Sequence, residues 1–210
     1  MDITTTFRQN LLPAVTITDA DDAVPVAQAL LKGGLDVMEI TLRTPAALQS
    51  IENIARHLPE MTIGAGTVRN THEIQQAVDC GARFGLAPGF DKAVVNEAQK
   101  KSFPFIPGIM TPSEIEQAVL AGCNLLKVFP VSPLGGPRFI SSLLGPYTDS
   151  DIRLIPMGGI DAKSAPDYCQ NPLVLAAGGS WMTPSQLIEQ ADFDTISAIV
   201  ENSIQSIKVE

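Results

Sequence analysis

The chain alternates between short apolar runs and longer segments in which apolar residues recur at helical spacing. Eight runs are rich in β-branched residues or bounded by Gly and Pro, and each predicts a buried β-strand. Their starts lie about 20–28 residues apart. The runs are Leu12–Ile17, Val37–Arg43, Thr62–Val68, Phe84–Gly89, Phe103–Ile109, Leu125–Val131, Arg153–Gly159 and Leu173–Ser180.

The segments between these runs predict helices, because amphipathic spacing lies between recognisable start and stop residues. Asp21–Gly33 ends in a Gly pair, and Thr44-Pro45 opens the next helix with a capping Thr and a first-turn Pro. Residues 1–10 predict a short N-terminal helix beneath the strands. The remaining helices are expected at Asn70–Gly81, Asp91–Lys101, Thr111–Gly122, Asp161–Gln170 and Pro184–Ile207, with a short one after Pro133–Pro137.

Eight strands alternating with eight helices predict an α/β fold, a closed parallel (β/α)8 TIM barrel with a short N-terminal helix. An open doubly wound sheet is the alternative. That fold would normally carry GxGxxG after its first strand, and Thr18-Asp19-Ala20 does not match it. The length of 210 residues, without a linker or low-complexity tract, predicts one domain over residues 1–210.

Composition removes several classes of function. A net charge of −9 and a pI near 4.6 argue against nucleic-acid binding. No apolar stretch reaches ~18 residues and the N-terminus has no signal-peptide pattern, so no membrane partner is expected. Three widely spaced cysteines without CxxC favour reduced thiols and a cytoplasmic location. The two histidines lack metal-site spacing, so no metal is expected.

Two ionisable side chains lie inside apolar strands, and in such a barrel the active site forms at the C-terminal strand ends. Lys127 is the one lysine of seven within a predicted strand. Burial there disfavours the ammonium form and frees a neutral amine for attack on a carbonyl. Glu39 shares the inward face of its strand with Thr41 and Arg43. The structural alternatives are a Glu39–Arg43 pair and a Lys127 that pairs with a carboxylate or extends to solvent.

Glycines lie at or near the ends of five of the predicted strands. Gly158-Gly159 and Gly178-Gly179-Ser180 indicate either phosphate-binding loops or simple turns. Gly64–Val68 contains Thr67, whose hydroxyl either faces the barrel interior or caps a helix. Pro88-Gly89 and Pro107-Gly108 are typical of turns that shape the rim.

With these residues in order, the chain resembles the 2-keto-3-deoxy-6-phosphogluconate (KDPG) / 4-hydroxy-2-oxoglutarate (KHG) aldolase family. Each matching stretch is weak alone, but together they span nearly the whole chain. They are Glu39–Thr44, Gly64–Val68, Ala87–Gly89, Ile106–Ile109, Leu126–Pro130, Gly158–Ile160 and Gly178–Trp181.

The resemblance implies a class I (Schiff-base) aldolase on a homotrimeric barrel, with no metal or organic cofactor. Its small-molecule substrate would be 2-dehydro-3-deoxy-6-phosphogluconate or 4-hydroxy-2-oxoglutarate, cleaved to pyruvate plus glyceraldehyde 3-phosphate or glyoxylate. Lys127 matches the Schiff-base lysine and Glu39 the proton-shuttling carboxylate. The matched substrate-binding residues are Arg43 and Thr67 for the pyruvate carboxylate, Phe129 and Pro88 for the pocket, and Gly158, Gly159, Gly179 and Ser180 for phosphate.

Three departures from the family pattern bear on recognition of the aldehyde half. Met157 replaces a usual Thr, Val131-Ser132 replaces a frequent Ala-Glu, and Thr18 stands where many members have a basic residue. The alternatives left open are an aldolase for 2-dehydro-3-deoxy-6-phosphogalactonate or an unphosphorylated oxo acid, a non-catalytic phospho-sugar-binding barrel, and a phosphate-binding isomerase or synthase.

Overall fold

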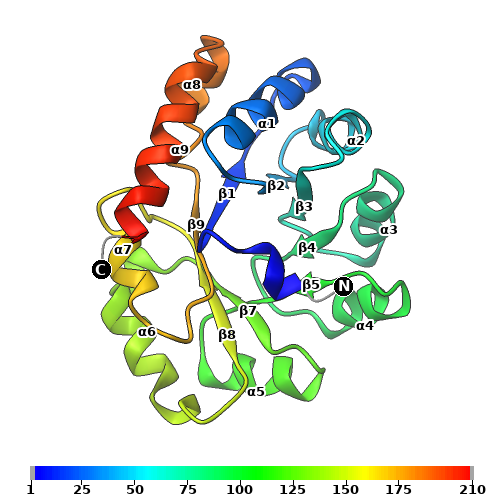
Figure 1. Cartoon of the computed structure of the whole chain (residues 1–210). Helices are drawn as coiled ribbons and strands as arrows, with labels where there is room; N and C mark the ends of the chain where they lie inside the picture. The colour runs from blue at the N-terminus through cyan, green and yellow to red at the C-terminus, as the bar shows by residue number, and fades with distance from the viewer. Residues whose placement is uncertain (1–2, 209–210) are drawn as a thin grey trace.

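The computed structural model describes residues 3–208, and its centre is a curled parallel sheet surrounded by helices (Figure 1). Within these residues one sheet has six strands in the order β5-β4-β3-β2-β1-β9, and a second has three in the order β6-β7-β8. The strands are β1 Leu11–Val15, β2 Val37–Thr41, β3 Thr62–Gly66, β4 Phe84–Leu86, β5 Phe105–Ile106, β6 Gly108–Ile109, β7 Leu125–Val128, β8 Arg153–Pro156 and β9 Ala177–Gly179.

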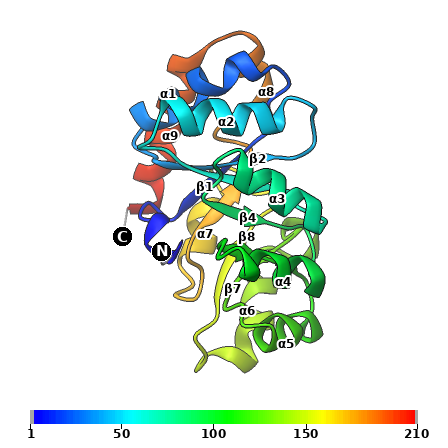
Figure 2. The same cartoon turned by 90° about the vertical axis from the view of Figure 1, so that its right-hand side faces the viewer.

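Helices follow the strands in alternation and lie on the outer side of the sheet (Figures 1 and 2). They are α1 Ala23–Lys32, α2 Ala47–His57, α3 Thr71–Asp79, α4 Lys92–Lys100, α5 Pro112–Leu120, α6 Pro137–Leu144, α7 Ala165–Cys169, α8 Ser185–Glu189 and α9 Phe193–Lys208. Short 3-10 turns are η1 Ile3–Thr6, η2 Ala20–Asp22, η3 Ser132–Leu134 and η4 Gly145–Tyr147. Among residues 3–208, no helix combines the length and the apolar character needed to cross a membrane.

The predicted parallel α/β fold is confirmed as a curled, half-barrel sheet of six strands with a second sheet beside it. The predicted strand Phe103–Ile109 divides into β5 and β6 at Pro107, because proline has no backbone N–H to donate to a ladder. At the other junction, parallel bridges join Leu154 to Val174 and Met157 to Gly178. These are isolated bridges, so β9 covers only Ala177–Gly179 of the predicted strand Leu173–Ser180.

Two predicted helices also differ from the structure. The N-terminal helix is the single turn η1, and the segment Pro184–Ile207 forms two helices, α8 and α9. Between them Ala191 has φ +52°, a left-handed conformation that ends α8. The N-terminal prediction for Met1 and Asp2 lies outside the described residues.

The space enclosed by the strands is filled with apolar side chains at one end. Leu12, Phe84, Ile106 and Ile155 come from four different strands and are fully buried in one cluster. Phe7, next to η1, packs edge-on against Phe84 with 5.9 Å between ring centroids. This apolar packing closes the N-terminal end of the strands, and the polar inward side chains lie toward the C-terminal end.

Candidate active site

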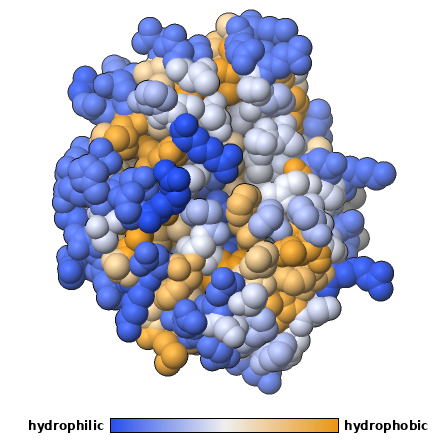
Figure 3. Space-filling model, turned by 180° about the vertical axis from the view of Figure 1, so that it is seen from behind, coloured by the Kyte–Doolittle hydropathy of each residue, from blue (hydrophilic) through white to orange (hydrophobic). Residues whose placement is uncertain are grey.

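A cavity of about 290 Å³ lies at the C-terminal ends of the strands. Its walls come from β1, β2, β7 and β9 and from the residues that follow β8, which brings together segments far apart in the sequence. Figure 3, viewed from the side opposite to Figure 1, shows hydrophilic side chains gathered near the middle of that face. The lining residues are Ala14, Thr16, Glu39, Thr41, Arg43, Lys127, Phe129, Met157, Gly158, Gly159, Ile160, Gly179 and Ser180.

Lys127 and Glu39 form an ion pair inside this cavity. Lys127 Nζ lies 3.6 Å from Glu39 Oε1, and the two side chains are only 7% and 1% exposed. Burial disfavours both charges, whereas each charge stabilises the other. The pair therefore confirms that both side chains point inward, and it matches the alternative in which Lys127 pairs with a carboxylate. The other alternative, a Glu39–Arg43 ion pair, is not found among residues 3–208.

The second carboxylate oxygen of Glu39 is buried without a hydrogen-bond partner in the described part of the chain. Gly66 of β3 provides the space for this carboxylate, because a Cβ there would lie 2.8 Å from Glu39 Cδ and 2.9 Å from Oε2. An unsatisfied buried oxygen costs about 1–3 kcal/mol. A ligand that donates a hydrogen bond into the cavity would remove that cost.

An aromatic ring and two glycines form the wall beside the lysine. Lys127 Nζ lies 5.4 Å from the centroid of the Phe129 ring. Gly158 has φ +95°, and a Cβ there would lie 3.0 Å from that ring. Gly159 has φ +80°, and a Cβ there would lie 2.8 Å from Ser132 Cβ. Only glycine fits these two positions without strain, so the backbone here approaches the cavity closely.

Most of the sequence-predicted site residues meet in this cavity, and two do not. Thr67 follows β3 with φ +63° and is half-buried outside the lining. Pro88 lines a separate cavity of about 200 Å³ together with Val68 and Phe90. The eight that line the cavity are Glu39, Arg43, Lys127, Phe129, Gly158, Gly159, Gly179 and Ser180.

Sequence reasoning assigned no role to several lining residues. Thr41 lies on the inward face beside Glu39, as its period-two position predicted, and it lines the cavity. Thr16, rather than Thr18, supplies the polar side chain that lines the cavity from the end of the first strand. Ala14 and Ile160 are small or apolar and carry no chemical signal.

The site has a group that can hold an anion but none that can hold a metal among residues 3–208. Arg43 reaches the cavity, and its guanidinium forms no ion pair among residues 3–208, so it is available to an anionic ligand. Within that same range, no group of three or more His, Cys, Asp or Glu side chains is placed to hold a metal ion.

These features define an α/β enzyme with a buried amine–carboxylate pair at the C-terminal ends of parallel strands. The family model for KDPG and KHG aldolase matches residues 3–199, and the chain belongs to that family. It is therefore an aldolase, a carbon–carbon lyase, as the resemblance implied.

Known proteins of similar sequence cover almost the entire chain. A 2-dehydro-3-deoxy-phosphogluconate aldolase from Treponema pallidum is 40% identical, with 96% of this chain and 95% of that protein aligned. The KHG/KDPG aldolase of Escherichia coli is 35% identical over 95% of this chain and 92% of its own. A Legionella pneumophila KDPG aldolase, solved with pyruvate captured at low pH as a covalent carbinolamine intermediate, superimposes with a TM-score of 0.91. It is 32% identical and covers 96% of this chain and 97% of its own.

Proposed function

We propose that the protein is a class I aldolase that cleaves a 2-oxo-4-hydroxy acid to pyruvate and an aldehyde. The substrates are 2-dehydro-3-deoxy-6-phosphogluconate, which gives glyceraldehyde 3-phosphate, and/or 4-hydroxy-2-oxoglutarate, which gives glyoxylate. The observation that carries the proposal is the distance of 3.6 Å between Lys127 Nζ and Glu39 Oε1 inside the cavity at the C-terminal ends of the strands. The names of the similar proteins support the same substrates.

The reaction begins at Lys127. Its neutral amine adds to the C2 carbonyl of the substrate, and the resulting carbinolamine loses water to give a protonated imine. Glu39 Oε1 lies 3.6 Å from Lys127 Nζ, so the carboxylate stands beside the carbon that becomes the imine. The covalent imine divides one high barrier into several lower ones.

Glu39 then serves as the acid–base group of the cleavage. Its carboxylate takes the proton of the C4 hydroxyl, the C3–C4 bond breaks, and the bonding electrons remain in an enamine on Lys127. Glu39 returns a proton to C3, and water releases pyruvate and the free amine. A positioned acid–base group contributes about 10²–10⁴-fold to such a step.

The other predicted residues hold the two ends of the substrate. Arg43 forms a bidentate contact with the C1 carboxylate, which its unpaired guanidinium favours. Thr67 and Pro88 lie outside the lining of this cavity, and their proposed contacts require substrate to extend toward β3 and β4. Phe129 borders the pyruvyl group.

Backbone N–H groups beside Gly158, Gly159, Gly179 and Ser180 are proposed to bind the phosphate. All four residues line the cavity. The positive φ angles of the first two support a close approach of backbone to ligand.

The finer architecture belongs to the same proposal. The sheet closes as a single (β/α)8 barrel domain over residues 1–210, supported by the bridges Leu154–Val174 and Met157–Gly178. The assembly is a cytoplasmic homotrimer without a metal or organic cofactor, supported by the resemblance and by apolar Met110, Val119 and Leu120 exposed at α5. Sedimentation at three times the mass of the 22.3 kDa chain tests the trimer.

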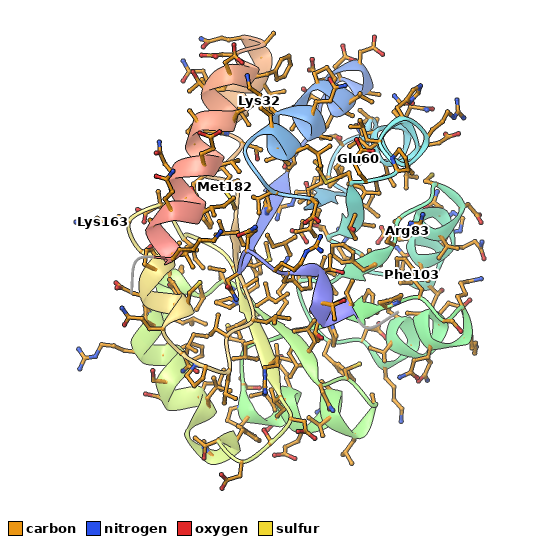
Figure 4. The ribbon with its side chains drawn as sticks, viewed as in Figure 1. Lys32, Glu60, Arg83, Phe103, Lys163 and Met182 are labelled. Atoms are coloured by element: carbon orange, nitrogen blue, oxygen red, sulfur yellow. The ribbon has the colours of Figure 1, made fainter. Side chains whose placement is uncertain are left out.

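Pyruvate release from a panel of 2-oxo-4-hydroxy acids, with and without the 6-phosphate, tests the activity. We expect turnover of the gluconate-derived substrate or of 4-hydroxy-2-oxoglutarate, and loss of turnover in Lys127→Met. Lys163→Met is the matched control, since Lys163 points away from the molecule into solvent (Figure 4). Turnover of the galactonate-derived acid alone would show that this acid, and not the two proposed, is the substrate. Thermal stabilisation by phospho-sugars without turnover would favour a binding protein.

Glu39→Gln tests the assigned role of the carboxylate. Imine formation with pyruvate is expected to persist, while cleavage falls by about 10²–10⁴-fold. Full activity in this variant would remove Glu39 from the mechanism.

A further inference from the structure

Two threonine hydroxyls meet on the cavity wall, and the mechanism above uses neither. Thr16 Oγ1 lies 2.9 Å from Thr41 Oγ1. The parallel register pairs Ala14 with Glu39 and Val15 with Ile40, so Thr16 comes beside Thr41 one step further along. Both threonines line the cavity. Thr41 is buried, with 5% of its surface accessible, whereas Thr16 is exposed to solvent.

Either threonine can donate in this pair, and only one of the two directions also leaves Thr41 a proton for the backbone oxygen of Val15. Each threonine hydroxyl has one proton to donate and two lone pairs to accept with. Thr41 Oγ1 donates to the backbone oxygen of Val15 at 3.3 Å, so its single proton is used. In that direction Thr16 donates to Thr41 and presents its lone pairs to the cavity. Thr16 is then an acceptor for a hydroxyl or N–H donor.

The strand order places this acceptor between the two ends of the site. β1 lies between β2, which carries Glu39, and β9, which ends in Gly179. Thr16 follows β1 and so stands between the carboxylate at the breaking bond and the glycines proposed to hold the phosphate. Along β2, Thr41 lies about 6.6 Å beyond Glu39 on the same face, toward the open end of the cavity. The atoms that pass this point belong to the aldehyde half of the substrate, on the far side of C4.

We propose that Thr16 is a specificity-determining residue that accepts a hydrogen bond from the hydroxyl on C5. This carbon is bonded to C4, and it becomes C2 of the aldehyde when the C3–C4 bond breaks. Thr41 is a positioning residue that fixes the Thr16 hydroxyl as an acceptor. The inference rests on the proposed aldolase function and deepens it. It makes the site selective for 2-hydroxylated aldehydes over aldehydes that lack this group.

The condensation direction tests the proposal with two aldehydes that differ only in the hydroxyl. Pyruvate is combined with glyceraldehyde 3-phosphate or with 3-oxopropyl phosphate, its analogue without the 2-hydroxyl. The selectivity is the ratio of kcat/KM for the two aldehydes, a quantity that partial misfolding of a variant does not change. Thr16→Val and Thr41→Val should each lower this ratio by about 3- to 10-fold, as expected for one neutral hydrogen bond.

Two further variants complete the design. Thr16→Ser keeps the hydroxyl and should retain the wild-type ratio. Thr18→Val is the matched control, because Thr18 is exposed two residues further on and lies outside the cavity lining. An unchanged ratio in Thr16→Val, with an active wild-type enzyme, would overturn this inference alone. A wild-type enzyme that joins pyruvate only to glyoxylate would overturn this inference alone, whereas one that joins pyruvate to none of the three aldehydes would overturn the proposed function as well.

Discussion

The glycine beside the buried carboxylate offers a way to move Glu39 without changing its chemistry. Gly66 ends β3, and its replacement by alanine adds one methyl group directed at Glu39. That methyl carbon would lie 2.8 Å from Glu39 Cδ, whereas carbon atoms pack best at about 3.5–4.0 Å. Because the contact is too short by about 1 Å, the carboxylate must move away from its position near Lys127.

The size of the expected effect follows from this displacement. A misplacement of about 1 Å at a reacting group costs about 10²-fold in rate, which corresponds to about 2.7 kcal/mol in the activation free energy. Overpacking also destabilises the fold by about 1–3 kcal/mol, and each kcal/mol lowers Tm by about 2–4 °C in a protein of this size. We therefore expect Gly66→Ala to fold, to melt several degrees lower and to turn over about 100-fold more slowly.

A coupled assay of pyruvate release at saturating substrate measures kcat, and circular dichroism at rising temperature measures Tm. Gly145→Ala is the control, because no atom lies within 4 Å of its added Cβ and its φ of −46° suits alanine. Wild-type kcat in Gly66→Ala, with the fold intact, would refute the claim that the position of Glu39 limits the rate.

Two further predictions concern titratable groups outside the cavity. Burial raises the pKa of the Cys123 and Cys169 thiols to about 11, so at pH 8 only about one thiol in a thousand is the reactive thiolate. Mass spectrometry should find both alkylated by iodoacetamide far more slowly in the native protein than in urea, and equal rates would contradict their burial. Hydrogen bonds from the Ser164 hydroxyl and backbone N–H hold the pKa of Asp161 below its usual value. Its stabilising effect is therefore present above pH ~4 and is lost as the pH falls through the lowered folded-state pKa. The Tm difference between wild type and Asp161→Asn should shrink from pH 6 to pH 3, and a difference independent of pH would contradict this cause.

Much of the fold is readable from the sequence because each strand is buried on both faces and each helix has its own boundary signals. All five residues of β2 are buried, and Thr111 with Glu114 forms a capping box at the start of α5. The misplaced boundaries have local causes. Pro107 interrupts a predicted strand, and the left-handed conformation of Ala191 divides a predicted helix, a conformation that the sequence does not announce in a non-glycine residue.

The site was predictable where a residue is chemically out of place in its strand. Lys127 and Glu39 stand out as charges within apolar runs, and they meet at 3.6 Å. Thr16 and Thr41 are ordinary β-strand residues, and their importance depends on the register between β1 and β2, which one sequence does not reveal. Tertiary contacts, more than local pattern, decide which of the polar residues line the cavity.

Trapping with borohydride is the most direct test of the covalent chemistry at Lys127. Reduction in the presence of pyruvate should convert the imine to a stable amine and add a three-carbon unit, which peptide mass spectrometry should locate on Lys127 and on no other lysine. The same treatment of Lys127→Met should give no adduct. An unmodified Lys127 in an enzyme that still releases pyruvate, or an adduct at another lysine, would contradict the account.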